Sequence, residues 1–459
     1  MNPKPDPRRD IPALSELLDS EDVPPLIVRY SRPVVVQALR KVTDAFRRDP
    51  PEPSIDAAAI LRTARERLEA GELDRLRPVV NATGILLHTG LGRAVLPQAA
   101  AAALGRLDRA CNLQIDLSTG KRGKRNFQCE RLICELTGAE AALLVNNNAA
   151  ATLLILAALC LGREVIVSRG ELIEIGGSYR LPDCVTASGA LLREVGTTNK
   201  THLRDYEGAL TENTGALLRV NPSNYRIIGF SQRVPLTDLV GLAKRRGLLL
   251  VDDLGCGALV DLQPYGLPRE PLVRDSLAAG ADIVCFSGDK LIGGPQAGII
   301  AGRKDLLDRI RKHPLTRMLR VGKLTDMALE QTLRLFRDPA SLSKTHPLYA
   351  MLAATPDDLR RRAEAFVRQI GEWPGISIVI EDGFSEMGGG SLPGVGIPTA
   401  LLSLRSSVVS PLDLSRRLRL REVPVVARVQ DDRVVLDMRT LLPDEDAIVS
   451  TAIQEAIHG

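Results

Sequence analysis

The chain has 459 residues, too long for one ordinary domain, so we expect two or three. Its 44% apolar and 25% charged residues are typical of a globular protein and exclude disorder as the main state. Only 3% of the residues are aromatic, which argues against an aromatic-belted membrane barrel or an aromatic base-stacking surface. The net charge of +4 is too small for non-specific coating of nucleic acid, so any RNA contact must be local.

The cysteines and the N-terminus favour a cytoplasmic protein. Seven cysteines without paired CxxC spacing fit a reducing compartment, and they indicate neither a disulfide framework nor a metal site. The first residues, MNPKPDPRRD, lack the apolar run of a secretory signal. Residues 141–162 are uncharged and long enough for a membrane span. Because NNN interrupts them, we expect a strand, a polar loop and a helix instead, and no membrane contact.

Residues 1–75 are expected to form a separate helical unit, because prolines punctuate short helical stretches. The clearest is PVVVQALRKVTDAFRRD, in which apolar residues from Val35 to Phe46 recur at helical spacing. The opposite face of this helix is either solvated or in contact with RNA, and it carries Arg40, Lys41, Arg47 and Arg48.

Residues 76–350 alternate between strand-length apolar runs and helical segments, which predicts an α/β domain with a mostly parallel sheet. The runs are ALLV, EVIVS, ALLRV, LLLVDD, DIVCFS and GIIAG. Ligands of such sheets bind at the carboxyl ends of the strands. Residues 351–459 are expected to form a small α+β domain: a helix, a strand, the Gly-rich loop MGGGSLPG, a helix, two strands and a last helix.

The segment DIVCFSGDKLIGGPQAG is the most informative one for chemistry. A buried strand ends there, and a short polar turn presents Ser287, Asp289 and Lys290. A lysine in desolvated surroundings at a strand end can form a Schiff base with an aldehyde cofactor. The alternative is a surface lysine in a turn.

Two other strand ends support the cofactor interpretation. The strand in LLLVDDLGCG ends in two carboxylates, one of which can pair with a protonated pyridine nitrogen. We choose Asp253 for this role and keep Asp252 as the second candidate. The alternative without a cofactor is that the carboxylate caps the N-terminus of a helix. In VNNNAAATLL a strand ends and a helix begins, and the free N–H groups and the dipole of that helix can bind a phosphate. Asn147, Asn148 and Ala149 are the expected phosphate cradle. Along the chain, the phosphate cradle comes first, the acidic strand end second and the lysine third. This order is expected of an aminotransferase-like (fold type I) pyridoxal phosphate enzyme.

The chain also resembles the bacterial selenocysteine synthase family, L-seryl-tRNA selenium transferase. The resemblance runs along the whole chain and is carried by NATGILLHTGLGRA, LLVNNNAAATLL, EVGTTNKTHLRDY, PSNYRIIGF, FSGDKLIGGPQAG, KHPLTRMLRVGKLT and GGGSLPG. It implies pyridoxal 5'-phosphate on Lys290, a cytoplasmic location, and active sites at dimer interfaces inside a homo-oligomeric ring of dimers.

The resemblance further implies the residues that handle a selenium donor. Arg93, Arg317 and Arg320 match the family's oxyanion site, and Asp289 matches another active-site position. Planar guanidinium groups suit a phosphate-like donor such as selenophosphate. The alternative for Arg317 and Arg320 is a basic helix face.

The resemblance implies conversion of L-seryl-tRNA(Sec) to L-selenocysteinyl-tRNA(Sec) by β-replacement through a dehydroalanyl intermediate. The substrate partner would be selenocysteine tRNA charged with serine. The first rival function is a small-molecule pyridoxal phosphate lyase of the same superfamily, and the second is a non-catalytic RNA-binding protein. The chain departs from the family pattern at Gly90, Cys256 and Asn221, which puts hydrogen bonding near the substrate in doubt.

Overall fold

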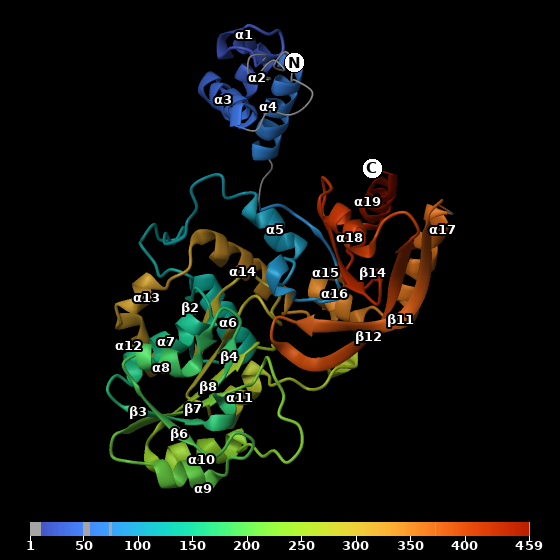
Figure 1. Cartoon of the computed structure of the whole chain (residues 1–459). Helices are drawn as coiled ribbons and strands as arrows, with labels where there is room; N and C mark the ends of the chain where they lie inside the picture. Colours follow the sequence, from blue (N-terminus) through green and yellow to red (C-terminus); the bar gives the residue numbers. More distant parts are fainter. Residues whose placement is uncertain (1–10, 49–55, 73–75, 372, 459) are drawn as a thin grey trace. The chain divides into compact units, whose positions relative to one another are not determined.

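The computed structural model describes residues 11–48, 56–72, 76–371 and 373–458 (Figure 1). The chain divides into two compact units, residues 1–78 and 79–459. Residues 1–10, 49–55 and 73–75 of the expected N-terminal unit lie outside the described residues. The expected division at residues 75 and 350 stays a prediction.

The N-terminal unit is helical, as expected. Its helices are α1 (Leu14–Leu18), α2 (Val23–Tyr30), α3 (Arg32–Arg48) and α4 (Ala57–Glu72). Helix α3 corresponds to the predicted stretch, and its apolar face is buried in one cluster with α1, α2 and α4 through Val35, Leu39 and Val42. The four basic residues of its other face are exposed.

The second unit contains a seven-stranded sheet in the order β2-β10-β9-β8-β7-β3-β6. All neighbouring strands pair in parallel except β10, which is antiparallel to β2 and to β9. The expected α/β class with a mostly parallel sheet is therefore confirmed. The strands are β2 (Ala141–Val145), β3 (Glu164–Ser168), β6 (Leu191–Val195), β7 (Thr214–Val220), β8 (Leu249–Gly255), β9 (Ile283–Ser287) and β10 (Gly298–Gly302).

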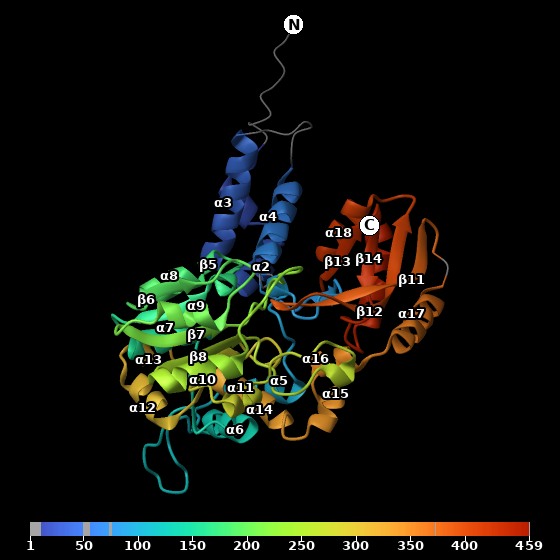
Figure 2. The ribbon, with the colours of Figure 1, turned by 90° about the horizontal axis from the view of Figure 1, so that it is seen from below.

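Helices cover both faces of this sheet (Figure 2). In β3, Val165 and Val167 join one apolar cluster and Ile166 joins the other, because successive side chains of a strand point to opposite faces. The helices are α5 (Gln98–Leu104), α6 (Phe127–Thr137), α7 (Asn148–Leu159), α8 (Leu181–Ala187), α9 (Leu203–Ala209), α10 (Leu236–Arg246), α11 (Val273–Ala279), α12 (Lys304–Lys312), α13 (Leu315–Met318), α14 (Lys323–Leu335), α15 (Leu342–Thr345) and α16 (Pro347–Ala353).

Short elements fill the connections of the large sheet. They are the 3-10 turns η2 (Thr89–Leu91), η3 (Arg169–Glu171), η4 (Gln263–Tyr265) and η5 (Pro339–Ser341) and the hairpin of β4 (Glu174–Ile175) with β5 (Tyr179–Arg180). The uncharged segment 141–162 forms β2, a polar turn and α7, as predicted. Within the described ranges, no helix is both long and apolar enough to cross a membrane.

The C-terminal part contains a five-stranded sheet in the order β1-β13-β14-β12-β11, of which the strands β11 to β14 are orange to red in Figure 1. Strand β1 (Val80–Ala82) pairs in parallel with β13, although it precedes the large sheet in the chain. The other elements are α17 (Pro356–Ile370), β11 (Ile376–Gly388), β12 (Ser391–Ser406), α18 (Pro411–Arg419), β13 (Val425–Gln430), β14 (Arg433–Asp437) and α19 (Asp446–His458).

The expected loop MGGGSLPG is shorter than predicted. Strand β11 runs to Gly388 and β12 starts at Ser391, so only a tight turn separates two long antiparallel strands. Gly388, Gly389 and Gly390 have φ of 71°, 59° and 71°, a backbone conformation that favours glycine. This run of left-handed residues allows the turn to be that short.

Candidate active site

A cavity of about 240 Å³ lies where β8 and β9 end and α7 begins. It is the place at which a doubly wound sheet binds its ligands. The cavity brings together eight of the ten predicted site residues, namely Arg93, Asn147, Asn148, Ala149, Asp253, Ser287, Asp289 and Lys290.

Asp253 is buried at the end of β8 and is surrounded by donors. Asn148 Nδ2 donates to Oδ1 at 2.7 Å, Thr152 Oγ1 donates to Oδ2 at 2.8 Å, and the backbone N–H of Gly255 donates to Oδ1 at 3.0 Å. Burial raises the pKa of the Asp253 carboxyl, and these hydrogen bonds and the charge of Lys290 oppose that rise. The donors also fix the direction in which the carboxyl points.

Asp252 occupies the opposite face of β8. Its Oδ1 accepts a hydrogen bond of 2.8 Å from the Arg219 guanidinium of β7, and its side chain is fully buried. Asp252 does not line the Lys290 cavity. The geometry therefore favours Asp253 over Asp252 as the partner of a cofactor.

Lys290 lies in the loop after β9 and is 7% exposed. Among the described residues, no hydrogen-bond or ion-pair partner of its ammonium group is found. A Cβ atom on Gly390 would lie 3.5 Å from Lys290 Nζ, so the turn between β11 and β12 passes close to the amine. A buried amine with no acceptor is suited to covalent chemistry.

Two aromatic side chains hold the backbone that follows Lys290. Tyr349 Oη donates to the Leu291 carbonyl at 2.9 Å, and His346 Nε2 lies 2.9 Å from the Ile292 carbonyl. Since a carbonyl oxygen only accepts, Nε2 carries the proton. Burial lowers the pKa of His346 to about 4, so the ring is neutral.

The start of α7 offers an anion site. Asn147 is its N-cap, and its side chain accepts a hydrogen bond of 2.9 Å from the backbone N–H of Ala150. The N–H groups of Asn148 and Ala149 in the first turn have no partner inside the helix and add to its positive end. Asn147 thus shapes the cradle through its cap, while the next two residues supply donors.

Arg93 and Asp289 form a close pair. Arg93 Nη1 donates to Asp289 Oδ2 at 2.5 Å, and the Asp289 side chain is nearly buried. Arg93 has φ of 65°, an uncommon conformation for a side chain of its size. Its backbone is strained at the position where its guanidinium reaches the cavity.

Arg317 and Arg320 do not line the cavity of this single chain. Both are exposed in and after the short helix α13. The positive charge of Arg125, followed by burial and Arg317, lowers the pKa of Arg320, so three guanidinium groups lie near one another. The Leu319 carbonyl beside them accepts from the backbone N–H of Asn146 at 2.8 Å, which ties this cluster to the turn before α7.

Comparison with known proteins identifies the family. A model described as L-seryl-tRNA selenium transferase matches residues 79–442, and one described as selenocysteine synthase N terminal matches residues 8–47. The chain is 45% identical to L-seryl-tRNA(Sec) selenium transferase of Geobacter sulfurreducens over 97% of this chain and 98% of the relative. It is 43% identical to the protein of that name from Carboxydothermus hydrogenoformans over 98% of each chain. The chain belongs to the L-seryl-tRNA selenium transferase family.

A solved structure supports the fold. D-Glucosaminate-6-phosphate ammonia-lyase has a TM-score of 0.57 and 21% identity to this chain, and the match covers 85% of this chain and 98% of that one. At this identity the likeness shows the fold alone. The predicted resemblance to the selenium transferase family and the aminotransferase-like fold are both confirmed.

Three residues depart from the expected selenium transferase pattern. Gly90 is exposed in η2, where a Cβ atom would lie 3.2 Å from the His88 ring. Cys256 is buried, and its Sγ lies 3.0 Å from Ser391 Oγ and 3.1 Å from the Gly390 carbonyl. Asn221 lines the Lys290 cavity, whereas Gly90 and Cys256 do not.

Several residues of the site were not singled out from the sequence. Thr152 and Tyr179 contact or line the Lys290 cavity, and His346 and Tyr349 brace its loop. Burial raises the pKa of the Tyr179 hydroxyl, so the phenol stays protonated. Tyr179 lies in SRGELIEIGGSYRLPD, which resembles the family, and this was the only available signal for it.

Proposed function

We propose that the chain is an L-seryl-tRNA(Sec) selenium transferase, which converts L-seryl-tRNA(Sec) to L-selenocysteinyl-tRNA(Sec). The near full-length identity of 43–45% to proteins of that name carries the proposal. The cavity that gathers Lys290, Asp253 and the start of α7 supports it, because the residues of the proposed chemistry lie together.

The residues fit pyridoxal phosphate. The buried amine of Lys290 matches the aldehyde of the cofactor. The buried carboxyl of Asp253, oriented by three donors, matches its ring nitrogen. The start of α7, with its free N–H groups, matches its phosphate. When bound, the cofactor supplies an electron sink for replacement at the β-carbon of serine. Lys290 would hold it covalently, Asp253 at the ring nitrogen, and Asn148 and Ala149 at the phosphate.

The chain's own groups have separate tasks in this reaction. Lys290 Nζ moves the proton at the α-carbon, since it is the buried amine of the cavity. The amide of Asn148 and the hydroxyl of Thr152 hold the Asp253 carboxyl in place. Asp289 orients Arg93 through their hydrogen bond, which directs one guanidinium group toward the cavity.

The selenium donor is proposed to be selenophosphate. Arg93, Arg317 and Arg320 are its proposed ligands, because guanidinium forks bind tetrahedral oxyanions well. The charges of Arg125 and Arg317 lower the pKa of Arg320, and such a positive neighbourhood favours an anion there. The exposure of Arg317 in α13 and of Arg320 after it suits an active site at a dimer interface, where these arginines of one protomer meet a cavity of the next.

The direct test is conversion of seryl-tRNA(Sec) by the purified holoenzyme with selenophosphate, followed by analysis of the aminoacyl group released from the tRNA. We expect selenocysteine from seryl-tRNA(Sec) and no reaction of free serine. Release of ammonia and the corresponding 2-oxo acid from small hydroxylated amino acids, with no action on seryl-tRNA(Sec), would favour the small-molecule lyase instead.

The N-terminal unit is proposed to bind tRNA, since its helix α3 exposes four basic side chains on one face. Neutralising Arg40, Lys41, Arg47 and Arg48 together should weaken tRNA binding and flatten its salt dependence, because each lost phosphate contact removes about one released counterion. Binding titrations at several salt concentrations measure both effects. The cofactor's absorption should not change, as every proposed cofactor ligand lies beyond residue 79.

Deletion of residues 1–78 provides the stronger form of this test. It should lower the affinity for seryl-tRNA(Sec) and leave the cofactor bound. Equal affinity of the truncated and full-length chains for selenocysteine tRNA, at the same ionic strength, would contradict the role in RNA binding.

A homo-oligomer and a cytoplasmic location complete the proposal. Ile228 and Phe230 are 89% and 88% exposed beside each other in the segment PSNYRIIGF. Apolar side chains exposed to this degree and only two residues apart are typical of interaction surfaces, and a second copy of the chain is the proposed partner.

A further inference from the structure

A second cavity, of about 300 Å³, lies beside the one that contains Lys290. Asn221 lines both cavities, and its backbone N–H donates to the Asp253 carbonyl at 2.8 Å. The turn between β11 and β12 and the start of β12 also join them, since Gly390 approaches Lys290 and Leu392 lines the second cavity. A ligand in the second cavity is therefore a direct neighbour of a group bound at Lys290.

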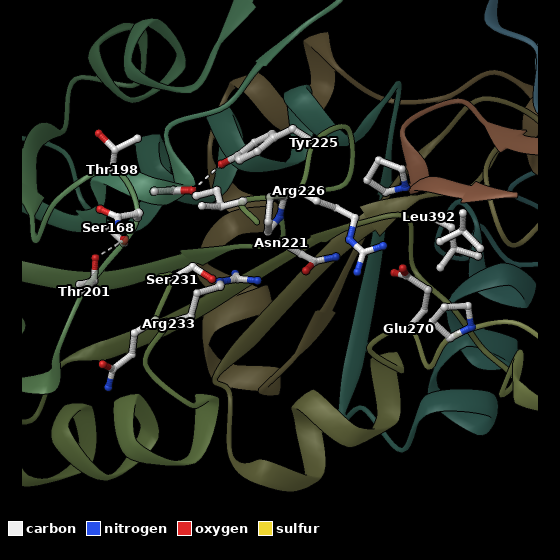
Figure 3. A pocket seen from close by; sticks show the side chains of 18 of the residues that line it. Ser168, Thr198, Thr201, Asn221, Tyr225, Arg226, Ser231, Arg233, Glu270 and Leu392 are labelled. Atoms are coloured by element: carbon white, nitrogen blue, oxygen red, sulfur yellow. Dashed lines mark hydrogen bonds between the residues drawn. The ribbon is translucent and has the colours of Figure 1, made fainter. Parts of the chain in front are cut away.

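Figure 3 shows how the side chains of this cavity are arranged. Glu270 and Leu392 stand at one end, and Ser168, Thr198 and Thr201 stand at the other. Asn221, Tyr225 and Arg226 lie between the ends, with the guanidinium of Arg226 toward Glu270. The cavity is thus lined by an aromatic ring, both signs of charge, and several hydroxyl and amide groups.

Glu270 is the acceptor of this cavity. Its side chain is half-buried, and no residue in the described ranges forms a hydrogen bond or ion pair with it. Burial alone raises the pKa of its carboxyl. A carboxylate that has lost water without gaining a partner is suited to accept from the O–H or N–H groups of a ligand.

Tyr225 and Arg226 supply the other two interactions. The Tyr225 hydroxyl donates to the Gly170 carbonyl, which fixes the ring in the wall of the cavity. Proteins often stack an unpaired RNA base on such a ring. Arg226 is exposed, and no ion pair with any described residue occupies its guanidinium, which leaves it available for a phosphate.

The neighbouring charges of this wall are already satisfied. Arg233 donates to Glu171 Oε1 at 2.9 and 3.3 Å and to the Val220 carbonyl at 3.0 Å. Glu171 in turn accepts from the Val220 backbone N–H at 2.9 Å. Arg269 is paired with Asp275 at 2.7 Å. Glu270 and Arg226 are left as the charged groups that a ligand can engage.

We propose that this second cavity binds the 3'-terminal nucleotide of the aminoacyl-ester substrate, with the nucleoside on Tyr225 and Glu270 and its phosphate on Arg226. The inference rests on the proposed function and deepens it. In an aminoacyl ester a single bond joins the seryl carbonyl carbon to an oxygen of the terminal ribose. A seryl group at Lys290 therefore places that nucleoside in the adjoining cavity. Asn221 spans the junction between the two.

The experiment measures binding of AMP and of adenosine to the full-length holoenzyme by calorimetry. Arg226→Ala should weaken AMP binding about tenfold and leave adenosine binding unchanged, because only AMP carries the phosphate. Glu270→Gln should weaken the binding of both about tenfold. Arg204→Ala and Glu212→Gln are matched controls, since both residues are exposed and line neither cavity, and they should bind AMP as the unchanged protein does.

Competition with the substrate completes the test. AMP should raise the KM for seryl-tRNA(Sec) without changing kcat, and Glu270→Gln should remove most of this inhibition. If seryl-tRNA(Sec) is converted but millimolar AMP neither binds nor competes, the nucleotide site is wrong and the function stands. If AMP binds with the expected dependence on Glu270 and Arg226 but no seryl-tRNA(Sec) is converted, the function is wrong and the nucleotide site stands.

Discussion

Lys290→Ala is expected to abolish both the covalent attachment of pyridoxal phosphate and turnover. Among the described residues, Lys290 is the lysine that lines the cavity, so no other amine there can replace its Nζ. The unchanged protein should be yellow, and borohydride reduction should fix the cofactor on the peptide that contains Lys290. Absorption spectra and peptide mass spectrometry provide the two readouts.

Lys344→Ala serves as the control, because this lysine is exposed in α15 and lies outside the cavity. It should keep the yellow colour and the reduced adduct. A reducible adduct that persists in Lys290→Ala, or a colourless unchanged protein after incubation with pyridoxal phosphate, would contradict the assignment of Lys290.

Asp253→Asn is expected to lower kcat by about a hundredfold or more while part of the cofactor stays bound. The scale is that of removing one preorganised electrostatic partner. The donors of the phosphate site at the start of α7 are backbone N–H groups, whereas Asn148 reaches Asp253 through its side chain, so binding and turnover should separate. Cofactor content by absorbance and single-turnover rates measure the two effects.

Asp252→Asn is the matched control, one residue earlier on the same strand. It should retain turnover but lower the free energy of unfolding by about 3 kcal/mol, because Arg219 loses its buried partner. Urea unfolding measures this loss. If the Asp252 variant loses turnover with its fold intact while the Asp253 variant keeps it, our choice between the two carboxylates is wrong.

The strands of the large sheet were predictable because most of them are apolar on both faces. EVIVS and DIVCFS, for example, correspond closely to β3 and β9. Strand β6 was missed, since it lies at the edge of the sheet and Leu191 is 51% exposed, so its sequence has no continuous apolar run. Strand β12 was missed altogether, because the glycines and prolines of its first half are typical of a loop.

The site was predictable where strand ends carry its residues. Asp253 and Lys290 each follow a buried strand, and parallel strands end at one edge of the sheet. The groups that hold them were not predictable, because Thr152 lies 101 residues before Asp253, and Tyr349 lies 58 residues after Leu291. Such long-range contacts leave no local spacing in the sequence.

The hydrogen bond of His346 to the loop after Lys290 also makes the free energy of unfolding depend on pH. A His346 pKa near 4 in the folded chain, against 6.5 for a free imidazole, means that acid favours the unfolded state. Its contribution is fully present above pH 6.5 and is lost as pH falls toward 4, a difference of about 3 kcal/mol. Urea titrations from pH 7 to 4 should therefore show a smaller loss of stability in His346→Gln than in the unchanged protein. The backbone that carries the cofactor lysine is thus also the point at which acid is expected to loosen the domain.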